Sequence, residues 1–340
     1  MKKINILITG AGSAVGQGIA KSLLLSKLNI KIIFADINKD NAGFYFKKNS
    51  IIIPDLKKNN SLKKMIEIIN KYKINVIFVG SELDLLFFSK NKNIIEKKTR
   101  AIVNVSPLNT IIMANDKFKT YEFFKKNNLT FVETFLVKNF NEAKAIARNI
   151  KFPFYIKESI GTSSRNVFKI YNILDLNYRF FTLTKPIIQK IAGDINKEFT
   201  ATVFKNAEGI ILNPFIARRK LKDGHSWITY VENYKNLANQ VINIANKINF
   251  VGSLNIQFQL LKKKIIPFEV NARISGTVAI RSFFNFNDPE MFILSFFLKK
   301  KISNKIIKKG VCYRYYNELF VRKTKSKNFF QQKGRICNWV

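Results

Sequence analysis

The first hundred residues alternate between short apolar runs and segments with helical spacing. Apolar residues at every third or fourth position predict helices over Gln17–Leu25 and Leu62–Lys71. The apolar runs between and around them have the length of buried strands and lie at residues 4–9, 31–35, 76–80 and 101–105. Strands that alternate with helices predict a parallel, doubly wound sheet.

The pattern changes after Asp116. This residue is placed to cap a helix that begins at Lys117. Further on, the spacing predicts strands near residues 130–137, 152–157 and 187–191, and a helix near 141–149. A strand of this second region ends at Lys157 and leads directly into Glu158–Arg165, which is rich in Gly, Ser and Thr. A lysine beside such a segment can hold phosphates, although surface loops have the same composition.

The segment Gly252–Arg273 predicts two strands joined by a lysine turn. A three-residue loop at 262–264 places Gln257 opposite Glu269, and Asn255 opposite Asn271. Because side chains two apart share a face, Glu269, Asn271 and Arg273 line up beside Gln257. Oxygen ligands and one fixed cation suit a magnesium nucleotide. The alternative is a polar, solvated hairpin face, and a one-residue slip would undo the pairing.

Composition agrees with a folded chain of two or three domains. The protein has 340 residues, of which 47% are hydrophobic, and its 59 Lys and Arg outnumber 22 Asp and Glu to give a net charge of +37. Such a charge ordinarily suggests binding to nucleic acid or to an anionic membrane. The basic residues are scattered in pairs and triplets, however, and accompany abundant Asn, Ile and Phe, so we attribute them to coding bias and expect no nucleic-acid partner.

Rare residue types exclude several classes of site. Cys312 and Cys337 show no metal-ligand spacing and no disulfide framework, so we expect a cytoplasmic protein. No apolar run has the length of a membrane span, and we expect no membrane partner. The single histidine, His225, excludes most histidine-dependent chemistry. What remains is chemistry by Lys, Arg, carboxylates and a metal ion, which is typical of phosphoryl transfer.

The N-terminal glycines suggest an alternative function. Gly10, Gly12 and Gly16 follow the first strand, and Asp36 ends the second, as in a nicotinamide-binding domain. The spacing departs from the dinucleotide fingerprint, because Val15 stands where the third glycine should be. Tight packing of strand against helix is the preferred explanation of this turn.

From Lys117 to Arg281 the chain resembles the ATP-grasp superfamily. As a whole it is similar to small single-unit proteins that look like half of a carbamoyl-phosphate synthase large subunit. The resemblance implies an α/β and α+β protein in which a Rossmann-like pre-ATP-grasp domain precedes a two-lobed ATP-grasp domain. The expected boundaries are 1–108 for the first domain, 109–190 and 191–305 for the two lobes, and 306–340 for C-terminal strands and a basic tail.

The resemblance also implies roles for individual residues. Lys157 and Arg273 would be catalytic, Arg273 by steadying the transferred phosphoryl group. The metal ligands would be Gln257, Glu269 and Asn271. The ATP-binding residues would be Lys117, Lys157, the loop residues Thr162, Ser163, Ser164 and Arg165, the hinge residues Gln189, Lys190 and Ile191, and Glu198 at the ribose.

Three positions depart from the usual pattern of the family. Lys190 stands where many relatives have an acidic residue, and Ala272 replaces a proline. Neither change removes a ligand. Gln257 is neutral where many relatives have a carboxylate, although the carbamoyl-phosphate synthase branch resembles this chain at that position. Whether Gln257 weakens metal binding is left open.

The implied reaction is ATP-dependent ligation of a carboxylate to an amine through an acyl phosphate. ATP and Mg2+, with Mn2+ as an alternative, would be the cofactors, and small-molecule carboxylates and amines the partners; a homodimer is left open. Arg218, Arg219 and His225, expected in a loop, are candidates for binding an anionic substrate or are simply a solvated basic loop. Glu82 and Asp84 are candidates for binding the amine or for capping a helix. Residues 310–321 suggest a final strand pair, and 323–333 a solvated tail.

Overall fold

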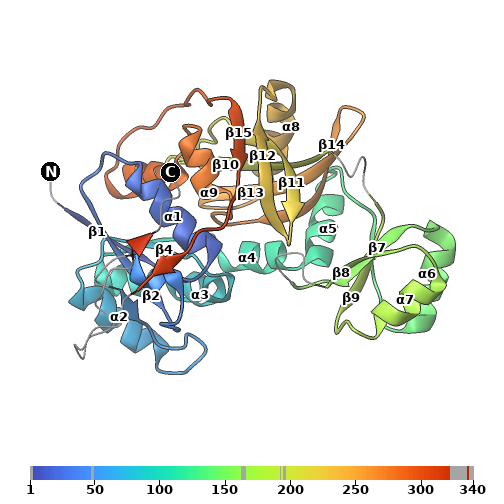
Figure 1. The fold of residues 1–340 in the computed structure, drawn as a ribbon, viewed down its shortest axis with the longest axis horizontal. Coiled ribbons are helices and arrows are strands. Elements are labelled where there is room, and N and C mark those ends of the chain that lie inside the picture. Colours follow the sequence, from blue (N-terminus) through green and yellow to red (C-terminus); the bar gives the residue numbers. More distant parts are fainter. Residues whose placement is uncertain are drawn as a thin grey trace.

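The computed structural model describes residues 3–46, 50–161, 166–191, 193 and 197–321, and the strand at 335–336. The elements form three large sheets (Figure 1). A parallel sheet lies at one end of the long axis and a four-stranded sheet at the other, with a six-stranded sheet between them. Within the part of the chain that is described, no helix has the length and apolarity to cross a membrane.

The N-terminal sheet is parallel and has the strand order β3-β2-β1-β4-β5. This confirms the doubly wound, Rossmann-like arrangement expected from the alternating pattern. The elements are β1 (Ile4–Ile8), α1 (Ala14–Leu24), β2 (Ile30–Asp36), a short 3-10 helix (Ala42–Tyr45), β3 (Ile51–Ile52), α2 (Ser61–Lys71), β4 (Val76–Phe78), α3 (Glu82–Thr99) and β5 (Ile102–Asn104).

The glycine turn after β1 is a packing device. A side chain at Gly16 would collide with the carbonyl oxygen of Gly10, and one at Gly43 with the carbonyl oxygen of Ala11. The Asp36 carboxylate accepts a hydrogen bond from the Gly12 backbone at 2.9 Å. Tight contact of strand, helix and turn therefore accounts for these glycines.

The four-stranded sheet is antiparallel and has the order β6-β9-β7-β8. Phe154 and Ile156 of this sheet are buried against Ala143 and Leu176 of the two helices that cover it. The elements from the first domain onward are α4 (Leu108–Asn115), α5 (Lys117–Lys126), β6 (Thr134–Leu136), α6 (Phe140–Ile150), β7 (Phe154–Glu158), β8 (Val167–Ile170), α7 (Ile173–Phe180) and β9 (Pro186–Gln189).

The six-stranded sheet is also antiparallel, with the order β14-β13-β10-β11-β12-β15. Its elements are β10 (Glu198–Lys205), β11 (Phe215–Lys222), β12 (His225–Val231), α8 (Lys235–Asn246), β13 (Gly252–Leu261), β14 (Lys264–Asn271), α9 (Val278–Phe283), α10 (Asp288–Phe292), a π-helical turn (Ile293–Phe297) and β15 (Gly310–Tyr313).

Two apolar cores fix this sheet in the molecule. On one face, Phe199 and Ile256 pack with Val241 of α8. On the other face, Phe215 belongs to the same core as Ile19 of α1 and Val278 of α9. Helix α1 thus joins the parallel sheet to the six-stranded sheet. The face that carries Phe215 is apolar only in part, and its polar half is available for a site.

The C-terminal expectation was wrong in part. Residues 310–321 do not form a strand pair: β15 pairs with β12, and β16 (Leu319–Phe320) pairs with β17 (Arg335–Ile336). Residues 323–333 lie outside the described part of the chain.

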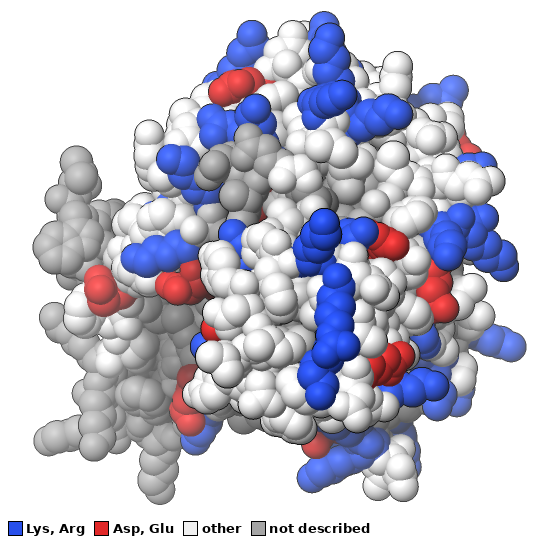
Figure 2. Space-filling view, turned by 90° about the vertical axis from the view of Figure 1, so that its right-hand side faces the viewer, with Lys and Arg blue, Asp and Glu red and all other residues white. Residues whose placement is uncertain are grey.

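Basic residues are spread over the end of the molecule that carries the four-stranded sheet. Figure 2 shows Lys and Arg on this face in several groups, with neutral residues between the groups and Asp and Glu interspersed. The charge on this face is not gathered into one patch.

Candidate functional site

One face of the six-stranded sheet carries a row of polar side chains. Thr200 of β10 pairs with Gln257 of β13, and Gln257 pairs with Glu269 of β14. Asn255 pairs with Asn271 in the same way. Opposed residues point to the same side of a sheet, so the pairing expected from the sequence is confirmed.

The loop behind this pairing differs from the expectation. Leu261 pairs with Lys264, so only Lys262 and Lys263 form the turn. The register then shifts between Gln257 and Phe258, where Phe268 is left without a partner. This bulge restores Glu269 to the position opposite Gln257.

Glu269 belongs to a chain of hydrogen-bonded side chains. Its Oε1 accepts from Gln257 Nε2 and from Asn271 Nδ2, each at 2.8 Å. Gln257 Oε1 in turn accepts from the guanidinium of Arg219. Arg219 also donates to Glu198 Oε1, from Nε at 3.0 Å and from a terminal nitrogen at 2.6 Å. Five polar side chains from four neighbouring strands are thus held in fixed positions.

The four-stranded sheet contributes Lys157 from the other side. Lys157 is buried in β7 and donates to Gln189 Oε1 of β9 at 2.7 Å. Burial, with the positive charge of Lys117, lowers the pKa of Lys157 to about 7, while Glu269 and Glu198 act in the opposite direction. The charges of Glu269 and Glu198, both on the six-stranded sheet, therefore act on Lys157.

Lys117 completes this group from the start of α5. Its Nζ donates to the Gly161 carbonyl oxygen at 2.8 Å. Burial lowers the pKa of Lys117, and Glu269 is the carboxylate that most opposes the shift. As expected, Asp116 caps the helix; it also accepts from Ser159 and Lys185. The cap therefore anchors Lys117 to the segment that follows β7.

The donor set suits a magnesium ion that arrives with phosphates. Glu269 supplies a carboxylate, and its Oε2 has no hydrogen-bond partner among the described residues. Gln257 and Asn271 each carry an amide oxygen, a ligand type that suits Mg2+, and their amide nitrogens hold Glu269 Oε1. Among the described residues, no group of three or more His, Cys, Asp or Glu is placed to hold a metal ion by itself. Mg2+ often has only one or two protein carboxylates and takes its other ligands from water and phosphate.

Arg273 lies just beyond β14 and is paired with the N-terminal domain. Its guanidinium forms an ion pair with Glu82, the first residue of α3, and donates to the Ile274 carbonyl oxygen at 3.1 Å. Two residues that the sequence treated separately are therefore in contact. The cap of α3 is Ser81, so neither Glu82 nor Asp84 has the capping role considered for them.

Asp84 lies apart from the polar row. It is buried in the first turn of α3, where burial raises the pKa of its carboxyl group to about 6, the Thr9 hydroxyl lowers it, and Asp36 raises it. Its neighbours belong to the parallel sheet.

The basic candidates on β11 and β12 occupy strands, where the sequence predicted a loop. Arg219 faces the polar row. Arg218 points to the opposite face and stacks on Tyr230, with 4.0 Å from its guanidinium carbon to the ring centre. His225 is exposed at the start of β12. The run of Arg and Lys suggested a solvated loop, but it forms a strand whose side chains point alternately to the two faces of the sheet.

The remaining ATP-binding candidates are placed as follows. Gln189 is buried and donates to Thr134 at 2.8 Å. Lys190 pairs with Glu133 at the surface, and Ile191 is half-buried. Thr162, Ser163, Ser164 and Arg165 lie outside the described residues.

Two arginines near the site were not singled out from the sequence. Arg281 is completely buried against Asp288, and Arg314 donates to the Gly276 carbonyl oxygen at 3.0 Å. No motif marks them, because their partners come from other elements.

Comparison with known proteins agrees with this geometry. A family model described as "ATP-grasp in the biosynthetic pathway with Ter operon" matches residues 196–319. The carbamoyl phosphate synthase large chain of Helicobacter pylori strain J99 is 23% identical over 303 residues, which cover 82% of this chain and 27% of that protein. The chain thus spans about a quarter of the length of this curated relative.

Solved structures show the same fold. The carboxyaminoimidazole ribonucleotide synthase of Aspergillus clavatus, complexed with ATP, matches with a TM-score of 0.74 at 13% identity, over 91% of this chain and 81% of that chain. The biotin carboxylase domain of Hydrogenobacter thermophilus 2-oxoglutarate carboxylase, in complex with MgADP, ADP and bicarbonate, matches with a TM-score of 0.70 at 15% identity, over 90% and 73%. The nicotinamide alternative receives no support from these comparisons.

Proposed function

We propose that this chain, which carries an ATP-grasp domain and has the ATP-grasp fold, is an ATP-dependent carboxylate-amine ligase. One observation carries the proposal: α5, which begins at Lys117, packs against β14, which carries Glu269, and the charge of Glu269 acts on both Lys117 and Lys157. Cations and carboxylates that come from different elements and lie near one another suit a triphosphate and its metal ion.

The proposed reaction has two steps. A substrate carboxylate oxygen attacks the γ-phosphorus of ATP, the bond to the β,γ-bridging oxygen breaks, and ADP leaves. The amine nitrogen then attacks the carbonyl carbon of the acyl phosphate, the carbon–oxygen bond to phosphate breaks, and the amine loses a proton. Amide and inorganic phosphate are released.

The side chains would act mainly by position and charge. Lys157 and Lys117 bind phosphate oxygens as point charges, and Arg273 offers its planar fork to the transferred group. Glu198 accepts from the ribose hydroxyls, and the backbone at Gln189–Ile191 meets adenine. Glu269, Gln257 and Asn271 hold Mg2+, which when bound neutralises the developing charge on the phosphates.

Nucleotide binding tests the first part of this proposal. The wild-type protein should be thermally stabilised by MgADP and by the magnesium complex of AMP-PNP, and should not respond to NAD or NADP. Glu269→Gln removes the carboxylate with little change in shape, and should abolish the magnesium-dependent part of the stabilisation. Glu67→Gln, an exposed position on α2, is the matched control.

Catalysis tests the second part. Phosphate release should be stimulated by at least one mixture of carboxylic acids and amines, and lost in Glu269→Gln and Arg273→Gln. Stabilisation by NAD in place of magnesium nucleotide would contradict the proposal.

A further inference from the structure

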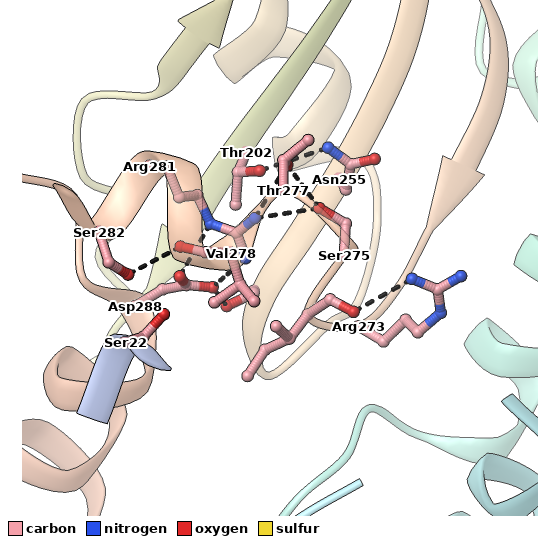
Figure 3. Close-up of polar contacts among 12 residues, drawn as sticks. Ser22, Thr202, Asn255, Arg273, Ser275, Thr277, Val278, Arg281, Ser282 and Asp288 are labelled. Atoms are coloured by element: carbon pink, nitrogen blue, oxygen red, sulfur yellow. Dashed lines mark hydrogen bonds and ion pairs between the residues drawn. The ribbon is translucent and has the colours of Figure 1, made fainter. Parts of the chain in front are cut away.

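A charged cluster is completely buried behind the loop that carries Arg273. Arg281 of α9 and Asp288 of α10 are both 0% exposed. Two parallel hydrogen bonds join them, from Nε to Oδ1 at 2.8 Å and from the terminal nitrogen to Oδ2 at 2.7 Å (Figure 3). Ser253 of β13 donates to the same carboxylate at 2.5 Å.

The rest of the Arg281 guanidinium holds the loop between β14 and α9. Its second terminal nitrogen donates to Ser275 Oγ at 3.0 Å and to Thr277 Oγ1 at 3.1 Å. Both hydroxyl residues are buried, with exposed fractions of 6% and 4%. They are therefore placed to fix the loop and not to contact a nucleotide themselves.

Net stability does not explain why these residues are charged. A buried ion pair is commonly replaceable by apolar residues without loss of stability, whereas its directional bonds fix geometry. Arginine is suited to this task, because its planar fork can bind a carboxylate with one edge and two hydroxyls with the other. The feature that this geometry fixes is the path of the chain from Arg273 to Thr277.

The backbone conformation of this loop determines where the Arg273 side chain lies. Figure 3 shows its guanidinium leading away from the Arg281 cluster, with the Ile274 carbonyl oxygen as an acceptor. Arg273 follows Asn271 by two residues, so a change in the loop would displace it relative to Glu269 and Asn271. The positive charge of Arg281 also acts on Arg273, and Asp288 limits that repulsion by pairing with Arg281.

We propose that Arg281 is a positioning residue: through Asp288, Ser275 and Thr277 it fixes the 273–277 loop so that Arg273 reaches the terminal phosphate of the nucleotide. The inference rests on the proposed function. It adds a specific consequence, which is that loop geometry controls discrimination between a triphosphate and a diphosphate.

The test compares two substitutions at Thr277 in the full-length protein. Thr277→Val keeps the shape and removes the hydroxyl, whereas Thr277→Ser keeps the hydroxyl. Calorimetric titration with the magnesium complexes of AMP-PNP and ADP gives the ratio of their dissociation constants. We expect Thr277→Val to lower the preference for AMP-PNP by roughly 3- to 10-fold, with Thr277→Ser close to wild type and ADP affinity unchanged.

Three further variants guard against a purely structural explanation. Arg273→Gln defines the preference that remains without the arginine. Arg281→Lys keeps the charge but cannot bridge all three partners, so it should behave like Thr277→Val. Ser253→Ala removes a contact to Asp288 without touching the loop, and should leave the ratio unchanged. Melting temperatures in saturating MgADP show whether each variant is folded.

An unchanged ratio in Thr277→Val and Arg281→Lys, with a reduced ratio in Arg273→Gln, would overturn the inference and leave the proposed function intact. An unchanged ratio in Arg273→Gln would overturn it as well, because Arg273 would then not contact the terminal phosphate. If the wild-type protein binds neither nucleotide, the proposed function itself fails.

Discussion

Lys157 is buried, whereas lysines ordinarily keep the ammonium group in water. Its place at a strand end, before a segment rich in Gly, Ser and Thr, predicts a phosphate-binding role that stays a prediction. The sequence could not predict the burial, because the surrounding groups come from elsewhere. Gln189 lies on a neighbouring strand, Lys117 on a helix, and Glu269 on another sheet. Burial and the charge of Lys117 lower the pKa of Lys157, and Glu269 opposes this shift.

We expect magnesium-nucleotide binding to be accompanied by proton uptake at pH 8. Lys157, with a pKa of about 7, is then mostly neutral in the free protein. Bound phosphates would raise this pKa and favour the protonated form. At pH 6 the lysine is already protonated, and uptake by it should vanish. Titration with MgADP in buffers of different ionisation enthalpy measures the protons taken up.

The matched control for this experiment is Lys119→Met, an exposed position in the first turn of α5. It should retain the uptake, whereas Lys157→Met should lose it. Equal uptake in the two variants would show that another group titrates.

The β13–β14 hairpin shows what sequence can and cannot determine at the scale of an element. Alternation of polar and apolar residues identified both strands and the face shared by Gln257 and Glu269. The number of turn residues was wrong by one, and the bulge at Phe268 compensates for it. Bulges depend on the whole sheet and have no strong local signal. The parallel sheet was easier to predict, because its buried strands alternate regularly with amphipathic helices.

Deleting Phe268 should abolish magnesium-nucleotide binding in a protein that still folds. Removal of the extra residue would shift the register of part of β14 by one residue. Either Glu269 and Asn271 or their apolar neighbours would then point to the wrong face of the sheet. We expect a near-native circular dichroism spectrum and a loss of nucleotide affinity of at least about 10-fold. Insertion of one glycine between Lys262 and Lys263 is the control, since an exposed turn accepts an added residue at low cost. Retained affinity after the deletion would contradict the role assigned to the bulge.

At the scale of the whole molecule, the site depends on contacts between segments that are remote in the sequence. Helix α1 packs on α9, and a side chain at Gly18 would press on Val278. Glu82 at the start of α3 pairs with Arg273 after β14. Neither contact leaves a pattern in a single sequence, because each requires two separate sheets to be docked first. The resemblance to ATP-grasp proteins supplied the general arrangement, but not these specific pairs.

The pairing of Glu82 with Arg273 leads to a test of how the N-terminal domain affects the nucleotide. A terminal phosphate and the Glu82 carboxylate would compete for the same guanidinium, so Glu82→Gln should free Arg273 for phosphate. We expect the dissociation constant of the magnesium complex of AMP-PNP to fall by roughly 3- to 10-fold, with that of MgADP unchanged. The melting temperature without nucleotide should fall, because Arg273 loses its partner.

Glu67→Gln serves again as the control, because its exposed carboxylate is remote from Arg273 in the sequence and lies on α2. The sequence-based alternative, in which Glu82 binds the amine, makes a different prediction for the same variant: AMP-PNP affinity stays constant, and the KM for the amine rises. The two outcomes distinguish two roles of Glu82: pairing with Arg273, and binding of the amine substrate. A variant with both effects would indicate that the amine displaces Glu82 from Arg273, which would couple arrival of the second substrate to release of the arginine.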